Sequence, residues 1–182
     1  MNALQNVGLF LVESLFSLYI GAVLLRFLLA WARANFYNPL SQFLVKVTNP
    51  VLVPLRRMIP AVGKVDTAAI VLALGLTIVK VLLLVVIAGV SAGFLTIVLS
   101  AISDLLRAAI WIYIFALIVQ AVMSWTGNLY GNPLADLLSS LTEPLLRPIR
   151  QLLPSVGMVD LSPMVAVLLL NVVLIILQSF GL

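Results

Sequence analysis

Three charged side chains lie inside long apolar stretches of this sequence, and they are its strongest candidates for chemistry. Glu13, Lys80 and Arg107 each interrupt a segment that is otherwise apolar. A charge at the centre of a membrane-spanning helix costs roughly 2.5–3.5 kcal/mol on insertion scales unless it is paired. These side chains are therefore expected either to hold helices together as ion pairs or to belong to an ion pathway.

An internal duplication relates two of these charges to each other. Residues 38–66 read NPLSQFLVKVTNPVLVPLRRMIPAVGKVD and residues 132–160 read NPLADLLSSLTEPLLRPIRQLLPSVGMVD, with 14 of 29 positions identical. The offset is 94 residues, and it carries Glu13 onto Arg107. We predict that the helices bearing these two residues are adjacent and that the side chains form a salt bridge, with Lys80 as the competing partner for Glu13.

The elements that must position these charges are membrane helices. The chain of 182 residues is 64% hydrophobic and 9% charged, whereas about a quarter of a soluble chain is charged. Apolar stretches at about 8–32, 67–90, 105–126 and 161–182 each reach the ~20 residues that cross a bilayer. The prediction is an all-α membrane protein with four transmembrane helices in two tandem two-helix repeats, residues 1–94 and 95–182.

The distribution of basic residues predicts the orientation of these helices. Seven of the ten Lys and Arg residues lie in the two repeated loops, 33–66 and 126–160, and none lies in the link 91–103. Because cytoplasmic loops are enriched in Lys and Arg, both loops are predicted to be cytoplasmic and both termini to lie outside. Arg26, near the inner end of the first helix, is expected to snorkel toward the interface.

Each repeated loop should form a kinked amphipathic hairpin at the membrane interface. Its first segment is apolar at helical spacing, at Leu40, Phe43, Leu44 and Val47 and again at Leu134, Leu137, Leu138 and Leu141. Ser41, Gln42 and Lys46 should face the other way. A series of prolines is expected to prevent any long regular helix: Pro50, Pro54 and Pro60, and in the second copy Pro144, Pro148 and Pro154.

Several residues of the repeated motif have structural roles that their types explain. Asn38–Pro39 and Asn132–Pro133 suit helix starts, because Asn caps free amides and Pro fits the first turn. Asp66 and Asp160 stand just before apolar helices, in the usual capping position. Gly63 and Gly157 fit turns that need permissive backbone angles.

The loop arginines leave two interpretations open. Arg56, Arg57, Arg147 and Arg150 are candidates for contact with anionic lipid headgroups or a protein partner. Alternatively, Arg56 and Arg150 each pair with the Asp ten residues further on, Asp66 and Asp160, and close the hairpin.

Composition and motifs exclude many activities. The sequence has no Cys and no His, which removes disulfides, Cys- and His-based catalytic triads and most zinc sites. No phosphate-binding loop or hydrolase motif is present, so we expect no enzyme, no metal and no cofactor. The basic charge follows membrane loops, so headgroups rather than nucleic acid are the expected partners.

The repeated pattern resembles the YggT family, also called YlmG. It consists of a Trp that closes a helix, then NPL, T-x-P-x-L-x-P-x-R and P-x-V-G-x-V-D, and it covers nearly the whole chain. The resemblance implies a small multi-pass protein of the bacterial inner membrane with no established reaction. The first half departs slightly, with Thr67–Ala68–Ala69 where the second has Leu161–Ser162–Pro163.

The resemblance also implies two classes of function. One is osmotic stress protection with potassium-linked ion homeostasis, acting directly or through a partner, and transport would require a homo-oligomer. The other is a membrane scaffold or assembly factor for a cytochrome, division or nucleoid-organising complex. The absence of His argues against this chain itself ligating haem.

Overall fold

The computed structural model describes residues 2–63, 65–126, 131–152 and 160–179, and all of its named elements are helices. In chain order they are α1 (Ala3–Trp31), α2 (Pro39–Met58), α3 (Thr67–Ala88), α4 (Phe94–Thr126), α5 (Pro133–Leu152) and α6 (Ser162–Ser179). Four of them are long and apolar enough to cross a membrane: α1, α3, α4 over Phe94–Ser124, and α6. The predicted fold class, all-α with four candidate spans in two tandem repeats, is confirmed.

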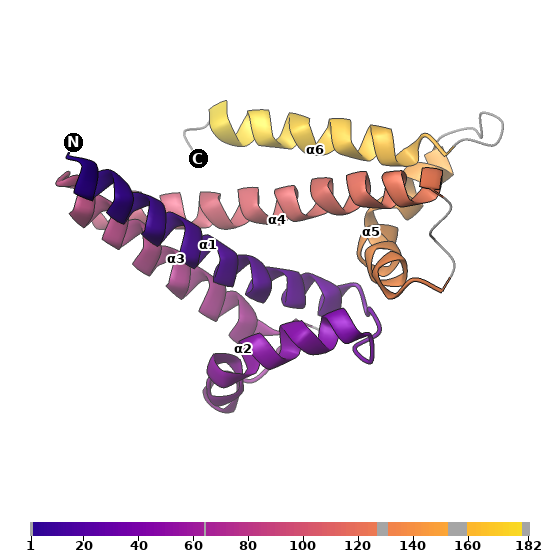
Figure 1. The fold of residues 1–182 in the computed structure, drawn as a ribbon, viewed down its shortest axis with the longest axis horizontal. Helices are drawn as coiled ribbons and strands as arrows, with labels where there is room; N and C mark the ends of the chain where they lie inside the picture. Colours follow the sequence, from indigo (N-terminus) through magenta and orange to yellow (C-terminus); the bar gives the residue numbers. More distant parts are fainter. Residues whose placement is uncertain (1, 64, 127–130, 153–159, 180–182) are drawn as a thin grey trace.

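The spans form two pairs that correspond to the two copies of the sequence. Figure 1 shows α1 lying along α3 and α4 lying along α6, while α3 also packs against α4. The first residues of α1 and the last turn of α6 lie at the end of the molecule away from α2 and α5 (Figure 1). Each half therefore consists of a first span (α1 or α4), a second helix (α2 or α5, called the interfacial helices below) and a returning span (α3 or α6).

The link between the two halves is shorter than the sequence predicted. Helix α3 ends at Ala88, and Gly89 caps it with a φ of 69° in the left-handed region, where glycine is unstrained. Helix α4 then begins at Phe94 rather than near residue 105, so most of the predicted link at 91–103 is helical. The extra segment, FLTIVLSAIS, contains no proline or glycine, so nothing in it interrupts the helix.

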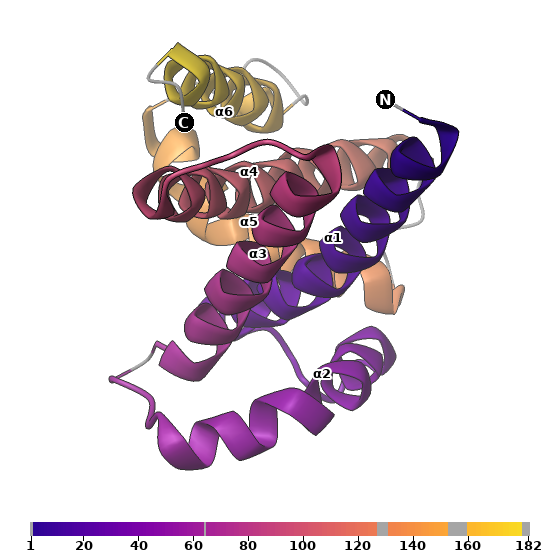
Figure 2. The same ribbon diagram turned by 90° about the vertical axis from the view of Figure 1, so that its left-hand side faces the viewer.

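The interfacial helices run through their internal prolines, which corrects the expectation of a broken helix. Pro50 and Pro54 lie inside α2, and Pro144 and Pro148 lie inside α5. A proline removes one backbone hydrogen bond and its ring pushes on the preceding turn, which bends a helix without always ending it. Figure 2 shows α2 changing direction part-way along its length. The predicted kink is present, but within one helix of 20 residues.

Four positions of the repeat are buried in both α2 and α5. They are Ser41, Leu44, Thr48 and Leu52 in α2, and Ala135, Leu138, Thr142 and Leu146 in α5, which also buries Leu137, Leu141 and Ile149. Ser41 was expected to face away from the apolar side, but it is fully buried and its hydroxyl donates to the backbone oxygen of Asn35. Leu40 and Phe43 are instead exposed, so α2 also has apolar side chains on its surface.

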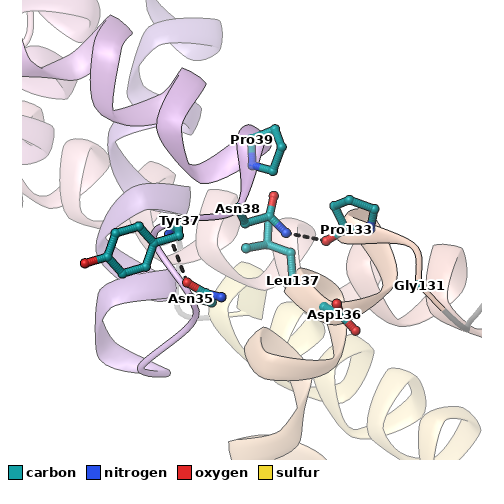
Figure 3. A pocket seen from close by; sticks show the side chains of 8 residues that line it. All are labelled: Asn35, Tyr37, Asn38, Pro39, Gly131, Pro133, Asp136 and Leu137. Carbon is teal, nitrogen blue, oxygen red and sulfur yellow. Dashed lines mark hydrogen bonds between the residues drawn. The ribbon is translucent and has the colours of Figure 1, made fainter.

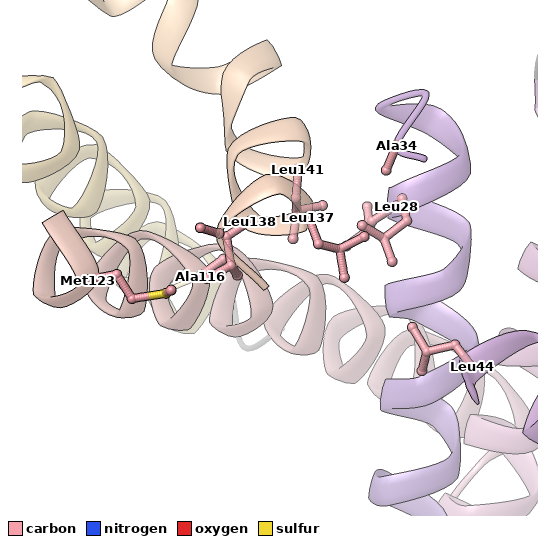
Figure 4. Close-up of a cluster of buried hydrophobic side chains, with 10 residues drawn as sticks. Leu28, Ala34, Leu44, Ala116, Met123, Leu137, Leu138 and Leu141 are labelled. Carbon is pink, nitrogen blue, oxygen red and sulfur yellow. The ribbon is translucent and has the colours of Figure 1, made fainter. Parts of the chain in front are cut away.

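Three buried clusters hold the molecule together. The core of the first half contains Val23, Leu52 and Leu72, and the core of the second contains their counterparts Leu117, Leu146 and Ala166. The third cluster joins the halves where α1, α2, α4 and α5 meet. Figure 4 shows Leu28 and Ala34 facing Leu137 and Leu141 across this seam.

Candidate functional site

A lysine held between two carboxylates lies inside the spanning helices. The Nζ of Lys80 on α3 lies 3.3 Å from Oε1 of Glu13 on α1 and 2.9 Å from Oδ2 of Asp104 on α4. Lys80 is 5% exposed, whereas the carboxylate side chains are 53% and 34% exposed. The cluster of Glu13, Lys80 and Asp104, the intramembrane charge cluster below, therefore ties three spans together around one buried ammonium group.

The helical period of α3 explains why this lysine points inward. The buried positions of α3 include Ala69, Ala73, Thr77 and Lys80, which fall on one face of a helix. The small alanines allow α1 to approach this face closely, and Lys80 extends the same face toward the C-terminal end of α3. At 1.5 Å per residue, Lys80 lies ~20 Å along α3 from its first residue.

The predicted salt bridge between Glu13 and Arg107 is wrong, because Glu13 pairs with a different residue. The ion pair that Glu13 forms in the structure is with Lys80, the competing partner. Helices α1 and α4 do touch, but α3 packs against both of them, and its lysine reaches the acid on each side. Arg107 lies one turn beyond Asp104 on α4.

Sequence reasoning missed Asp104 as the second acid of this cluster. Asp104 lies near the expected start of the third span, where a carboxylate is usually interpreted as a helix cap. Because α4 begins ten residues earlier, at Phe94, Asp104 lies within the helix instead. With all three groups ionised, one lysine against two acids gives the cluster a net charge of −1.

The repeated Arg–Asp pairing is confirmed in both halves. Arg56 forms an ion pair with Asp66, and the Nε of Arg150 lies 3.0 Å from Oδ2 of Asp160. Arg150 also holds Glu143, with 2.8 Å between Nη1 and Oε2. Each pair joins the end of an interfacial helix to the start of the returning span. Contact of Arg56, Arg57, Arg147 and Arg150 with headgroups stays a prediction.

The second pair, Arg150 and Asp160, shifts the pKa of both of its members. Partial burial alone would raise the pKa of Asp160, but hydrogen bonds from Ser162 and the Arg150 guanidinium outweigh it. The pKa of Asp160 therefore lies below its ordinary value of 3.8. The pKa of Arg150 is raised, since burial lowers it less than the bonds to Asp160 and Glu143 raise it.

The capping predictions are confirmed for every cap residue that the structure describes. Asn38 and Asn132 accept from the backbone amides of Leu40 and Leu134, at 2.9 Å and 3.0 Å. Asp66 accepts from Ala69 and Asp160 from Ser162. Gly63 has a φ of 61°, as its turn requires.

Other motif residues have varied outcomes. Pro39 and Pro133 open α2 and α5, Pro54 and Pro148 lie inside them, and Pro60 accepts a hydrogen bond from Thr67. Pro154 and Gly157 lie outside the described residues.

One cap also joins the two halves. The side-chain amide of Asn38 donates to the backbone oxygen of Pro133 at 2.5 Å, beside a cavity of about 220 Å³ (Figure 3). Gly131 and Asp136 line the second half's side of this cavity, and Tyr37 lines the first. The residues that start the two interfacial helices therefore meet where the two halves join.

A threonine at the same position of each copy fastens the interfacial helix to a span. Arg26 on α1 donates to Oγ1 of Thr48 at 2.5 Å, and Oγ1 of Thr142 lies 2.7 Å from Oε1 of Gln120 on α4. The 94-residue offset carries Arg26 onto Gln120 and Thr48 onto Thr142. Arg26 is 6% exposed, so it is held inside the protein and does not snorkel.

Metal binding finds no support in the part of the chain that the structure describes. Within it, no three Asp, Glu, His or Cys side chains gather where they could hold a metal ion. The polar side-chain interactions described above are ion pairs and hydrogen bonds.

Comparisons with known proteins cover both halves. The sequence model of the CCB3/YggT family matches residues 5–87 and 99–181. The chain is 43% identical to YggT of Escherichia coli strain K12 over 170 residues, 93% of this chain and 88% of that protein. It is 40% identical to an uncharacterized protein of Pseudomonas aeruginosa over 175 residues, 95% of this chain and 89% of that one.

A third relative matches a shorter part of the chain. The ycf19 protein of Guillardia theta is 32% identical over 73 residues, which are 39% of this chain and 79% of that protein. No solved structure matches the chain. With a family match on each copy of the repeat and close relatives along nearly its full length, this chain belongs to the CCB3/YggT family.

Proposed function

We propose that this protein is a non-enzymatic membrane protein that contributes to ion balance under osmotic stress. The observation that carries the proposal is the intramembrane charge cluster, in which Lys80 is buried between Glu13 and Asp104. Charged groups inside spans typically mark ion or proton pathways, because their insertion is costly unless they pair or serve a function. The excess of acid over base would attract a cation. The link to potassium and osmotic stress rests on the roles proposed for the YggT family.

The setting we propose is the inner membrane of a bacterium, with α2 and α5 on the cytoplasmic side and anionic headgroups around them. The enrichment of Lys and Arg in the two repeated loops supports this orientation. Because four spans do not by themselves enclose a pore, ion passage requires a homo-oligomer or a membrane-protein partner.

The test is potassium flux through liposomes that contain the purified protein. We expect flux when an osmotic gradient is applied, and loss of flux in the variant E13Q/K80M/D104N, which removes every charge of the cluster. D136N is the matched control, because it neutralises an exposed acid of α5 outside the cluster. Equal flux in the triple variant and the wild type would show that the cluster only holds the helices together and takes no part in ion passage.

A scaffold or assembly factor is the second candidate, favoured by the apolar cavities beside the interfacial helices. One cavity of about 500 Å³ and another of about 540 Å³ share the lining residues Leu25, Phe43, Leu44 and Ile112. Such surfaces suit an apolar helix of a membrane complex, for example one that assembles a cytochrome or organises division or the nucleoid. Absence of flux at every protein density would favour this function.

A further inference from the structure

A polar cavity lies where the end of α1 meets the exposed side of α5. Its volume is about 390 Å³. Trp31 and Arg33 line it from the first half, and Ser140, Glu143 and Arg147 line it from α5. Two arginines from opposite halves of the sequence therefore face one cavity.

This cavity has positive charge that the protein does not neutralise. In the described parts of the chain, no carboxylate lies within ion-pair distance of Arg33 or Arg147. The acid that lines the cavity, Glu143, is bound to Arg150 at 2.8 Å, and Arg150 is shared with Asp160. One acid charge therefore remains against the two arginines, and the lining keeps a net positive charge. A ligand entering here meets two guanidinium groups, which are donors suited to phosphate oxygens, whereas the Ser140 hydroxyl already donates to the backbone oxygen of Asp136.

The duplication shows that the fold does not require these arginines. The offset of 94 carries Arg33 onto Gly127 and Arg147 onto Val53, whereas Arg56 and Arg150, which close the hairpins, are present in both copies. Arg33 also has a φ of 55°, in the left-handed region that an arginine rarely adopts. A residue kept at a backbone cost, where the other copy has glycine, points to a role for its side chain.

The position of the cavity indicates what fills it. Trp31 closes the apolar span α1 and is 55% exposed, as expected of an aromatic side chain at the level of the headgroups. Phospholipid phosphates lie at this level of a bilayer. We propose that Arg33 and Arg147 bind the phosphate of an anionic phospholipid, with Trp31 against the upper part of its acyl chains.

The experiment compares lipid retention by the purified full chain. Protein in detergent is mixed with equal amounts of phosphatidylglycerol and phosphatidylcholine of the same chain length, and bound lipid is counted by native mass spectrometry. We expect the wild type to retain phosphatidylglycerol, and the variant R33G/R147V to retain about tenfold less. Both substitutions introduce the residue that the other half has at that position.

The matched control is K46Q, which removes an exposed basic residue of α2 that does not line the cavity. It is expected to retain phosphatidylglycerol as the wild type does. Equal loss in K46Q would reduce the effect to general surface charge and overturn the proposal, as would equal binding of the two lipids. If R33G/R147V fails to fold, R147Q alone should still lower retention of phosphatidylglycerol several-fold. Unchanged retention in R147Q would overturn the proposal.

A further arm separates lipid from soluble phosphate. Sodium phosphate is compared with sodium chloride at equal ionic strength, and the Tm of wild type and R33G/R147V is measured. We expect no stabilisation specific to phosphate, and a rise in Tm on adding phosphatidylglycerol to the wild type only. Stabilisation by inorganic phosphate but not by phosphatidylglycerol would assign the cavity to a soluble ligand and overturn the proposal.

Discussion

Lys80 is the residue on which the intramembrane charge cluster depends. Its ammonium group is the buried member, and it lies within 3.3 Å of both carboxylates. If the base is removed, two acids remain near each other within the spans, each without the cation that it faces in the structure. Breaking a buried ion pair on one side costs far more than removing the whole set, because an uncompensated charge is left behind.

The variant K80M should therefore be less stable than the triple variant E13Q/K80M/D104N. We expect K80M to lower the free energy of unfolding by about 3 kcal/mol, at the lower end for buried pairs because both acids are partly exposed. The triple variant should recover most of that loss. Thermal unfolding in detergent measures both, and a K80M protein as stable as the wild type would contradict this account of the cluster.

At the scale of single residues, the sequence predicted those contacts that the duplication repeats. Arg56 with Asp66 and Arg150 with Asp160 share a spacing of ten, and two copies of one spacing indicate one geometry. The cluster has no such copy: Glu13 corresponds to Arg107, and Lys80 to Leu174. Its partners follow from how α3 packs between α1 and α4, and that packing is not encoded in any local pattern.

At the scale of elements, each interfacial helix is fastened to its span through a threonine hydroxyl. The fastening is charged in the first half, where Thr48 accepts from the Arg26 guanidinium, and neutral in the second, where Thr142 meets Gln120. Both threonines are fully buried. Because a buried charged donor is costlier to leave unsatisfied than a neutral group, the two halves should respond differently to the same substitution.

We expect T48V to cost about 2–3 kcal/mol of unfolding free energy and T142V about 1 kcal/mol. Valine keeps the shape of threonine and removes only the hydroxyl, so each variant is the control for the other. Thermal unfolding of the two variants side by side gives the difference. Equal losses would show that Arg26 finds another acceptor when Thr48 is gone.

The joint between α5 and α6 should weaken in acid. The pKa of Asp160 is lower in the folded chain than in the unfolded chain, so the unfolded state binds the proton more readily. The stability from this group is complete above the ordinary carboxyl pKa and is lost as pH falls through the folded-state pKa, below 3.8.

The variant D160N lacks this titrating group, so its stability should fall less between neutral pH and pH ~3. The difference should stay within about 1 kcal/mol, because the Asp160 side chain is partly exposed to solvent. Unfolding curves of D160N and wild type across this pH range measure it. Parallel curves would mean that Asp160 contributes nothing to the acid sensitivity.

Elements were predictable where hydrophobic length or a capping residue defines them. The four spans and the starts of α2 and α5 follow from such signals. The start of α4 did not follow from the sequence, because residues 94–103 are as apolar as the spans on either side and hydropathy gives no boundary there. The prolines were read as breaks, yet packing of the buried faces of α2 and α5 against the spans favours helix on both sides of each kink.

At the scale of the whole molecule, the two halves have the same orientation. Both interfacial helices start at one shared point, where Asn38 donates to Pro133, and both returning spans lead away from it. A unit with two crossings, repeated in tandem, must enter the membrane from the same side each time. This differs from inverted repeats, whose halves face opposite sides. The basic residues of both copies are therefore predicted to lie on one side of the membrane, so that a single assignment orients the whole chain.

That assignment predicts which positions are reachable from outside a cell. Because the chain has no Cys, single cysteines at Asn6, Gln42, Ser139 and Ser179 report position without background. All four side chains are exposed. A thiol reagent that cannot cross membranes should label N6C and S179C in intact cells, because the ends of the chain are predicted to lie outside. It should label Q42C and S139C only after the membrane is permeabilised, because the enrichment of Lys and Arg predicts that both interfacial helices lie on the cytoplasmic side. Labelling of Q42C in intact cells would reverse the orientation, and different behaviour of Q42C and S139C would contradict the parallel arrangement of the two halves.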